Sequence, residues 1–504
     1  MQNLYKTTNA LDKRLLSKFL LHDEILMENV ANAMFALIQK ITHAQSVITI
    51  VCGSGDNGGD GYVLARKLHG SYKVRIYEAK EPKSKLCKIQ SERANLCEIE
   101  RVKKILPCDV IVDCLFGSGF SGEMRVEYIK LIESMNCHSR LRVACDIPSG
   151  LDMEGNIAQI AFKADYTISM GALKLALFSD MAKDIVGEVL VGDLGVSRAL
   201  YEVRTPFFLL EKSDLKLPFR ESQNCHKGNF GHLAVIMGEK KGAGILSALA
   251  ALRMGAGLVS VIGQLDGYPE IMCAQEIPHN ANVIAIGMGF GRNFANRANS
   301  QKNDEKSGEI HNENNENNEN NGEKQSDIIS FNPTYKQISL IDLLGSTCAV
   351  IDADLFYASE LKDLLIARKD LPNIVLTPHP KEFVSLLEIC GIAQISLQEV
   401  ITQKIELALR FSEMFPNVVL LLKGANPIIA FQSRIYINPL GNSALAKGGS
   451  GDVLSGIISA YLAQGFSTLD SALFGSMAHA LAARCERASY ALTPLRLIEH
   501  LGKL

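Results

Sequence analysis

Two glycine-rich segments, one in each half of the 504-residue chain, carry the residue types that phosphate chemistry requires. The first runs from Val51 to Gly61 and the second from Lys447 to Leu454. Glycine lets backbone N–H groups approach an anion closely, and a turn that opens a helix presents those groups to a phosphate. The sequence therefore predicts two nucleotide-handling sites, one on each of two domains.

Oxygen-bearing side chains follow several predicted strands in the first half. Asp113 and Asp146 each end an apolar run, and in an open parallel sheet ligands bind beyond the carboxyl ends of the strands. An aspartate in that place can also serve only as a helix cap, and taken singly both roles fit. Because the two aspartates occur together with the glycine segment, a role in a binding site is favoured over a role as helix caps. Asn57, Asp113 and Ser149 offer the hard oxygen ligands that suit K⁺ or Mg²⁺.

The second glycine segment is followed directly by Asp452. A Gly-Ser-Gly turn that opens a helix stabilises charge on a moving phosphoryl group, and the aspartate after it can take a proton from a substrate hydroxyl. A plain loop before a helix is the alternative, and four small residues in a row disfavour it. Lys423 at the end of an apolar strand suits a nucleotide phosphate. For His379, between two prolines, a structural role and a ligand role fit equally.

Short apolar runs alternate with helical spans in both halves, which predicts an α/β fold with parallel sheets covered by helices. Predicted strands lie at 46–52, 73–77, 110–113, 142–146, 166–170, 233–238, 257–261, 283–287, 349–352, 374–377 and 418–422. A polar stretch over 211–224 separates a domain at 1–212 from one at 220–504. Residues 293–330 contain a Glu-Asn-Asn repeat and predict a disordered insertion, because they hold too few apolar residues to fold.

Composition excludes several classes of function. Hydrophobic residues make up 47% and charged residues 21% of the chain, as in soluble globular enzymes. The net charge of −3 gives no electrostatic reason to expect nucleic acid or a membrane surface as a partner. The twelve scattered cysteines favour reduced thiols, and the N-terminus lacks the apolar core of a signal peptide. We therefore expect a cytoplasmic enzyme that acts on small molecules, assembled as a homo-oligomer.

The motifs of the first half resemble the NAD(P)H-hydrate epimerase domain over about residues 1–210. They are the segments 53–61, 112–122, 146–152 and 171–177. The resemblance implies a Rossmann-like, three-layer fold that interconverts the R and S epimers of hydrated NADH and NADPH, with K⁺ held by Asn57, Asp113 and Ser149. It assigns substrate binding to Asp56, Asn57, Gly58, Gly59, Asp60, Gly117, Ser118, Gly119, Phe120, Ser121, Gly122, Glu123 and Asp146. Epimerisation needs proton transfer, and Asp146 and Lys174 are the acid–base candidates, although Lys174 also fits a phosphate-binding or structural role.

The second half resembles the ADP-dependent NAD(P)H-hydrate dehydratases, which have a ribokinase-like α/β/α fold. The segments that carry the resemblance are 226–232, 242–259, 287–291, 376–383, 422–426 and 442–456. It assigns the hydrated substrate to Ala243, Gly289, His379 and Asp452. It assigns the adenine nucleotide, ADP or the product AMP, to Lys423, Gly424, Ala425, Asn426, Pro427 and Gly451. ADP is then a co-substrate, and Mg²⁺ is expected to bridge its phosphates.

Two other classes of function stay open at this point. A kinase for a vitamin precursor or a sugar shares the Gly-Ser-Gly-Asp turn, but it leaves a stable phosphorylated product, whereas a dehydratase releases free phosphate. The first domain could also be a non-catalytic nucleotide-binding module, since related folds can lose their chemistry. The presence of Asn57, Asp113, Asp146 and Ser149 argues against that alternative.

Overall fold

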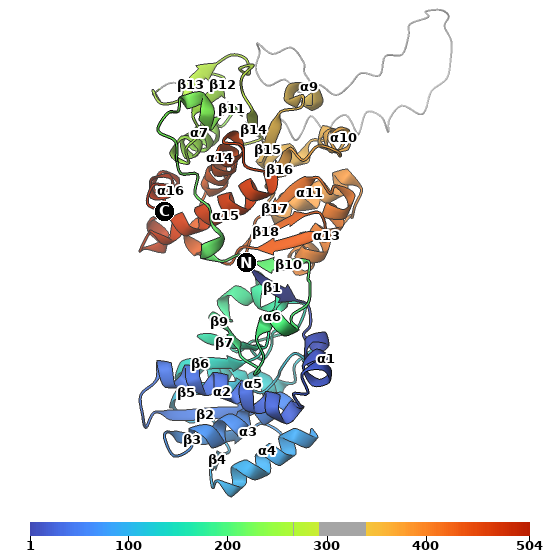
Figure 1. Ribbon diagram of the computed structural model, residues 1–504, viewed down its shortest axis with the longest axis vertical. Helices are drawn as coiled ribbons and strands as arrows, with labels where there is room; N and C mark the ends of the chain where they lie inside the picture. Colours follow the sequence, from blue (N-terminus) through green and yellow to red (C-terminus); the bar gives the residue numbers. More distant parts are fainter. Residues whose placement is uncertain (266, 292–338) are drawn as a thin grey trace, which may run out of the picture. The chain divides into compact units, whose positions relative to one another are not determined.

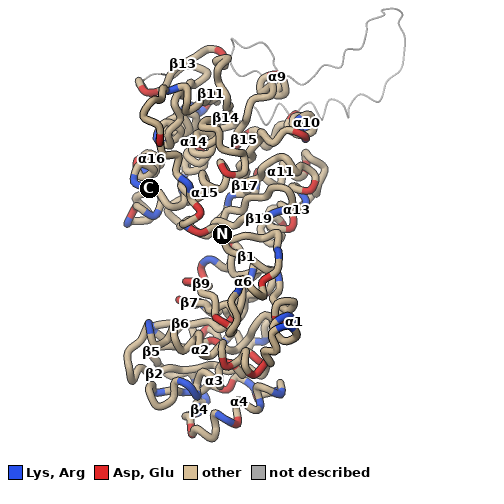
Figure 2. The backbone as a smooth tube through the Cα atoms, viewed as in Figure 1, with Lys and Arg blue, Asp and Glu red and all other residues tan. Residues whose placement is uncertain are grey.

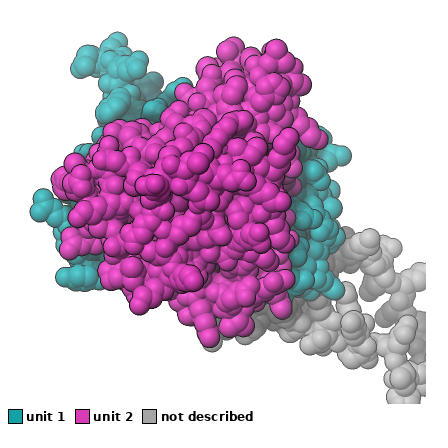
Figure 3. Space-filling model, turned by 90° about the horizontal axis from the view of Figure 1, so that it is seen from below, with its two compact units in different colours: residues 1, 209–504 teal, residues 2–208 magenta. Residues whose placement is uncertain are grey.

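The computed structural model describes residues 1–265, 267–291 and 339–504 (Figure 1). The predicted insertion at 293–330 lies outside the described residues. The chain divides into two compact units, one of residues 2–208 and one of residue 1 with residues 209–504 (Figure 3). Both units are mixed α/β structures with parallel sheets, so the predicted fold class is confirmed.

The unit of residues 2–208 is built on a seven-stranded sheet in the order β4-β3-β2-β5-β6-β7-β9, and each neighbouring pair is parallel. Its strands are β2 (Val47–Cys52), β3 (Lys73–Glu78), β4 (Glu100–Val102), β5 (Cys108–Cys114), β6 (Ser139–Cys145), β7 (Tyr166–Met170) and β9 (Glu188–Gly192). A short parallel pair is formed by β1 (Gln2–Tyr5) and β8 (Leu173–Lys174). The helices are α1 (Asn9–Lys18), α2 (Asp23–Ile41), α3 (Asp56–Leu68), α4 (Lys85–Leu96), α5 (Val126–Cys137) and α6 (Arg198–Tyr201), and β10 (Phe207–Leu209) follows.

Alternate residues of the central strands enter two different cores, because successive side chains of a strand point to opposite faces. Val110 and Val112 of β5 pack with α2 and α3, whereas Ile111 packs with Leu131 and Ile132 of α5. Helices therefore cover both faces of the sheet, as the continuous apolar strands require. This three-layer arrangement leaves the carboxyl ends of the strands free to build a site.

The unit of residues 209–504 has a sheet in the order β13-β12-β11-β14-β15-β16-β17-β18-β19. Its strands are parallel up to β17, and the last two pairs are antiparallel. The strands are β11 (His232–Ile236), β12 (Leu258–Ile262), β13 (Met272–Ala274), β14 (Val283–Ile286), β15 (Cys348–Ile351), β16 (Ile374–Leu376), β17 (Val418–Leu422), β18 (Ile428–Phe431) and β19 (Arg434–Ile437). The helices are α7 (Lys241–Arg253), α9 (Leu340–Leu344), α10 (Glu360–Ala367), α11 (Pro380–Cys390), α12 (Leu397–Thr402), α13 (Lys404–Met414), α14 (Ser450–Ala463), α15 (Thr468–Arg484) and α16 (Pro494–Leu501).

Helix α14 is the most enclosed helix of this unit, and it packs against α7, α15, α16, β14 and β15. The crossing with α7 is close because Gly456 faces the backbone of that helix: a Cβ atom at this position would lie 2.1 Å from the carbonyl oxygen of Ser247. The Ser247 hydroxyl in turn donates a 2.7 Å hydrogen bond to the carbonyl oxygen of Asp452. The first turn of α14, which carries the predicted base, is thus fixed by the core.

Basic and acidic residues are interspersed along the backbone of both units (Figure 2). Among the described helices, none combines the length and the apolar composition needed to cross a membrane.

We expect Gly456→Ala to lower the free energy of unfolding of residues 209–504 by about 1–3 kcal/mol, because the new methyl group overlaps a backbone carbonyl that cannot move alone. This loss should outweigh the better helix propensity of alanine. Calorimetric melting of the purified chain measures it. Gly441→Ala is the matched control, since its Cβ atom would lie 3.6 Å from Leu445, an ordinary contact. Equal melting temperatures for the two variants would contradict the close crossing.

Candidate active sites

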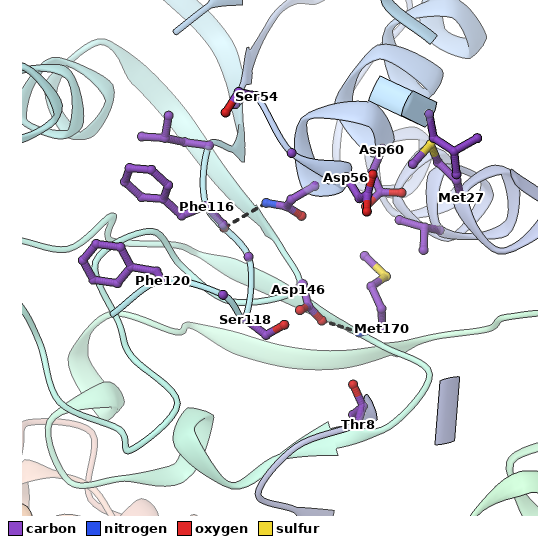
Figure 4. Close-up of a pocket in the computed structure, with 18 of the residues that line it drawn as sticks. Thr8, Met27, Ser54, Asp56, Asp60, Phe116, Ser118, Phe120, Asp146 and Met170 are labelled. Carbon is purple, nitrogen blue, oxygen red and sulfur yellow. Dashed lines mark hydrogen bonds between the residues drawn. The ribbon is translucent and has the colours of Figure 1, made fainter. Parts of the chain in front are cut away.

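The first predicted site is a cavity of about 710 Å³ at the carboxyl ends of the strands in residues 2–208 (Figure 4). Of the residues predicted to bind substrate or to transfer protons there, the cavity is lined by Asp56, Asn57, Asp60, Gly117, Ser118, Gly119, Phe120, Ser121, Asp146 and Lys174. The structure therefore brings together segments that are separated by more than 100 residues of sequence. Gly58, Gly59, Gly122 and Glu123 are not part of the lining.

Two glycines of the first segment have a packing role that the motif alone does not reveal. A Cβ atom on Gly53 would lie 2.0 Å from the carbonyl oxygen of Leu115, and one on Gly58 would lie 2.0 Å from the carbonyl oxygen of Gly53. Only glycine permits these approaches, which seat the start of α3 against the loop after β5. Gly58 thus affects the cavity indirectly, by allowing the start of α3 to pack closely against Gly53.

Asp146 and Lys174 form a buried ion pair at the cavity. The Lys174 ammonium lies 2.5 Å from Asp146 Oδ1, and the same oxygen accepts a hydrogen bond from the Met170 N–H at 3.1 Å. The lysine side chain is 2% exposed, so its charge is taken out of water and depends on the aspartate. Asp146 has a φ of +68°, a conformation that non-glycine residues rarely adopt and that clusters at functional sites.

The three predicted cation ligands are connected by hydrogen bonds: Asn57 lines the cavity, and Asp113 and Ser149 lie outside its lining. Asp113 accepts hydrogen bonds from the Ser149 N–H and from the Ser149 hydroxyl, both at 2.7 Å. The Asn57 amide donates to the carbonyl oxygen of Phe116 at 2.8 Å, and the Phe116 N–H donates to the Ser149 hydroxyl oxygen at 3.0 Å. Burial raises the pKa of Asp113 to about 6, and the hydrogen bonds from Ser149 oppose that shift. A neighbouring cation would stabilise this carboxylate, so the oxygen-rich set fits K⁺.

The cavity also has walls that the motifs did not predict. Thr8, Asp12 and Asp23 come from the region of the first two helices, which no chemical motif marks. Three aromatic residues also line the cavity. The ring centroids of the stacked Phe116 and Phe120 are 5.2 Å apart, and the centroid of Tyr128, which meets Phe116 edge-on, is 5.0 Å from that of Phe116. The stacked aromatic residues offer an apolar surface of the kind that a nucleotide base or a nicotinamide ring contacts.

The second predicted site gathers around Asp452, in the first turn of α14. The Lys423 ammonium lies 2.7 Å from Oδ1 of Asp352, whose side chain is 2% exposed. Oδ2 of Asp352 accepts a 2.6 Å hydrogen bond from the Ser455 hydroxyl of α14. A Cβ atom on Gly451 would lie 3.3 Å from the Lys423 ammonium. Lysine and helix terminus are therefore adjacent, and Asp352, which the sequence marked only as the end of a strand, joins them.

The electrostatics of this site favour a proton acceptor of moderate strength. Burial and the charge of Asp352 raise the pKa of Asp452 to about 6, while Lys423 lowers it. Burial also raises the pKa of Glu382 to about 7. For Lys423, burial lowers the pKa, but Asp352 and Glu382 more than compensate, so the net shift is upward and the lysine stays charged. A base that titrates near neutrality is suited to general base catalysis.

His379 is the N-cap of α11. Its ring nitrogen Nδ1 accepts a 3.1 Å hydrogen bond from the Glu382 backbone N–H, and the backbone N–H of His379 donates to a Glu382 carboxylate oxygen at 2.7 Å. Burial and then Lys423 lower the pKa of the imidazole, which favours the neutral ring. The structural role is thus established, and contact with substrate stays a prediction.

The remaining predicted residues lie in helix α7, on the loop after β14 and on the connection between β17 and β18. Gly289 has a φ of +70°, and a Cβ atom there would lie 3.0 Å from the Cβ atom of Ala243, so these two predicted substrate residues are neighbours. Lys423, Gly424, Ala425, Asn426 and Pro427 form the complete connection between β17 and β18. Their backbone is anchored where the buried Lys404 ammonium donates to the carbonyl oxygen of Asn426 at 3.0 Å.

His479 of α15 was not anticipated from the sequence. Its Nε2 atom lies 2.9 Å from the carbonyl oxygen and 3.1 Å from the hydroxyl of Ser450, the first residue of α14. Burial lowers the pKa of His479 to about 4, so the ring is neutral and donates or accepts one hydrogen bond at Nε2. The imidazole therefore holds the first residue of α14 in place. A histidine inside an apolar helix gives no sequence signal for this contact.

Comparison with known proteins gives a consistent result for both halves. Residues 23–176 match the family described as YjeF-related protein N-terminus, and residues 332–503 match NAD(P)H-hydrate dehydratase. The bifunctional NAD(P)H-hydrate repair enzyme Nnr of Helicobacter pylori is 43% identical over 100% of both chains. The chain belongs to the family of bifunctional NAD(P)H-hydrate repair enzymes. The predicted resemblance is thereby confirmed, and with it a two-activity enzyme, an isomerase joined to a lyase.

Other NAD(P)H-hydrate repair enzymes are more distant. The Nnr of Coxiella burnetii is 33% identical, with 91% of this chain and 89% of that protein covered. A solved structure of the ADP/ATP-dependent NAD(P)H-hydrate dehydratase from Bacillus subtilis, co-crystallised with ATP and Mg²⁺, is 21% identical, with a TM-score of 0.40. That comparison covers 57% of this chain and 92% of the other.

In this repair enzyme, Asp352→Asn should lower the free energy of unfolding of residues 209–504 by about 1–3 kcal/mol, because it leaves the partly buried Lys423 charge without its partner. Adding Lys423→Met removes the uncompensated charge, so the double variant should recover part of the loss. Calorimetric melting of the single and double variants tests this. A loss below about 0.5 kcal/mol for Asp352→Asn would show that the pair contributes nothing beyond an ordinary surface contact.

Proposed function

We propose that this chain repairs hydrated NADH and NADPH in two steps. The first domain, residues 1–212, interconverts the R and S hydrates, and the second, residues 220–504, dehydrates the S hydrate with ADP and releases AMP and phosphate. The observation that carries the proposal is the position of Asp452: a base with a pKa of about 6, at the start of a helix, beside a partly buried lysine.

Hydroxide is a poor leaving group, and the second site solves this problem by phosphorylation. Asp452 removes the proton of the substrate hydroxyl, whose oxygen then takes the β-phosphoryl group of ADP. The N–H groups of Gly449–Gly451, the dipole of α14 and the Lys423 ammonium stabilise the charge on the moving group. Phosphate then leaves as the neighbouring ring carbon loses a proton, which restores the dihydronicotinamide ring.

Mg²⁺ fits this site as an ion held mainly by the nucleotide. In the part of the chain that the structure describes, no group of three His, Cys, Asp or Glu side chains is arranged to hold a metal. Mg²⁺ is commonly bound by one or two carboxylates together with substrate phosphates. Glu382 is the neighbouring carboxylate here, and the ion would neutralise part of the phosphate charge.

In the first domain, Asp146 and Lys174 are the proposed acid–base pair beside the hydrated ring. Asn57, Asp113 and Ser149 would hold K⁺, which would balance the buried carboxylate of Asp113 and the phosphate charge above it. The start of α3, residues 56–60, and the loop 117–121 would bind the substrate through their backbone N–H groups.

Asp452→Asn should lower the rate of dehydration by about 10²–10⁴-fold and leave epimerisation unchanged, because only the second site loses its base. The assay mixes both epimers of hydrated NADH with ADP and Mg²⁺ and follows absorbance of the reduced coenzyme and free phosphate. Full conversion by the wild type supports both activities. Conversion of one epimer only would remove the first activity, and a stable phosphorylated product would indicate a kinase. Glu388→Gln, on the exposed side of α11, is the control.

The pH dependence of dehydration should follow Asp452. Because the pKa of this carboxyl is raised to about 6, the base is protonated below that pH, and kcat/KM should fall about tenfold per pH unit there. Asp354→Asn should move the midpoint down, since the charge of Asp354 contributes to the upward shift. The titration of ADP itself is the same with the wild type and with Asp354→Asn. An unchanged midpoint of the pH profile would therefore assign the pH dependence to the nucleotide instead of Asp452.

A further inference from the structure

We infer that Asp60 is a second acid–base residue of the epimerase cavity, which acts on one face of the hydrated ring while Asp146 acts on the other. The inference rests on the proposed function of the first domain and adds a catalytic role to a residue that the motif assigns only to binding.

The two carboxyl groups enter the same cavity from different elements (Figure 4). Asp60 projects from the second turn of α3, and Asp146 follows the end of β6. Across residues 1–265, 267–291 and 339–504, no side chain or backbone group forms a hydrogen bond or ion pair with the Asp60 carboxyl. Asp146, in contrast, is held by Lys174 and by the Met170 N–H. One carboxyl is thus fixed by its partners, and the other is available to a ligand.

The surroundings of the two carboxyl groups differ. Burial raises the pKa of Asp60 well above its usual range, and the charges of Asp146 and Asp56 raise it further. These causes favour the protonated form of Asp60, whereas the Asp146 carboxyl lies 2.5 Å from the Lys174 ammonium. Two carboxyl groups whose environments separate their protonation states are the usual arrangement for an acid and a base in one site.

The charge of the cavity wall suits the intermediate that such a mechanism forms. Five aspartates line the cavity against two lysines, Lys80 and Lys174. Loss of the hydroxyl group from the hydrated carbon leaves a positive charge shared with the ring nitrogen, and nearby carboxylates stabilise that charge.

An epimer whose hydroxyl group faces Asp60 is inverted in two steps, loss of water and addition of water. The Asp60 carboxyl gives its proton to the hydroxyl, the C–O bond breaks and water leaves, while the lone pair of the ring nitrogen forms a C=N bond. Water then adds to the opposite face of the same carbon, the C=N electron pair returns to nitrogen, and Asp146 takes the released proton. The other epimer reacts in the reverse direction from the form of the site in which the proton lies on Asp146 and not on Asp60, a form reached by proton exchange with solvent. That reverse step returns the proton to Asp60.

Oxygen exchange in H₂¹⁸O separates this mechanism from a merely structural role. Each purified epimer is incubated with the full chain, without ADP or ATP, and mass spectrometry measures epimerisation and ¹⁸O incorporation after subtraction of the rate without enzyme. Wild-type protein should incorporate one ¹⁸O atom per epimerisation. Asp60→Asn should epimerise at least 100-fold more slowly but still exchange oxygen in one epimer, with retention. Asp146→Asn should exchange oxygen only in the other epimer.

Two controls on the same chain keep the result interpretable. Dehydration of the S hydrate by Asp60→Asn should equal that of the wild type, which reports a folded protein. Glu92→Gln, at an exposed position of α4 outside the cavity lining, should epimerise within twofold of the wild type.

Several results would overturn the inference. They are epimerisation by Asp60→Asn above one tenth of the wild-type rate, loss of exchange in both epimers, or wild-type epimerisation without ¹⁸O. Absence of epimerisation in the wild type would instead overturn the proposed function of the first domain, and the inference with it.

Discussion

An ion pair between a lysine and an aspartate that directly follows a parallel strand is the interaction on which both sites depend. Asp146 follows β6 and binds Lys174, and Asp352 follows β15 and binds Lys423, with N–O distances of 2.5 and 2.7 Å. In each unit the pair lies at the carboxyl end of the sheet, where ligands of open α/β sheets bind. The pair supplies a positive charge for a phosphorylated ligand, and it is stable only while both partners are present.

Much of this arrangement could be predicted from the sequence. The apolar runs marked the central strands, since a strand buried on both faces must be apolar throughout. The run at 46–52 became β2 and the run at 418–422 became β17 with nearly the expected bounds. The glycine segments marked the two helix starts, because few other structures need so many glycines within a short segment. These signals come from residues that are close together in the chain, so they can be recognised in a single sequence.

The contacts that bridge distant segments could not be predicted in the same way. Asp352 and Lys423 are 71 residues apart, and they meet because β15 and β17 flank β16 in the sheet. Nothing in the sequence fixes that order. The hairpin of β18 and β19 was missed for another reason: its turn uses Gln432 and Ser433 at positive φ instead of the asparagine and glycine that usually mark such turns. His479 was missed because a buried histidine shows its purpose only through its partner.

Helix α14 is at once the most enclosed helix of its unit and, in the proposed mechanism, the carrier of the N–H groups that stabilise the moving phosphoryl group. The same residues therefore determine folding and the placement of the reaction centre. A change that moves this helix terminus by a fraction of an ångström must also repack α7 and the sheet beneath. Evolution of a new substrate preference on this scaffold is thus directed away from the helix, toward connections that can vary in shape while the start of α14 stays where it is.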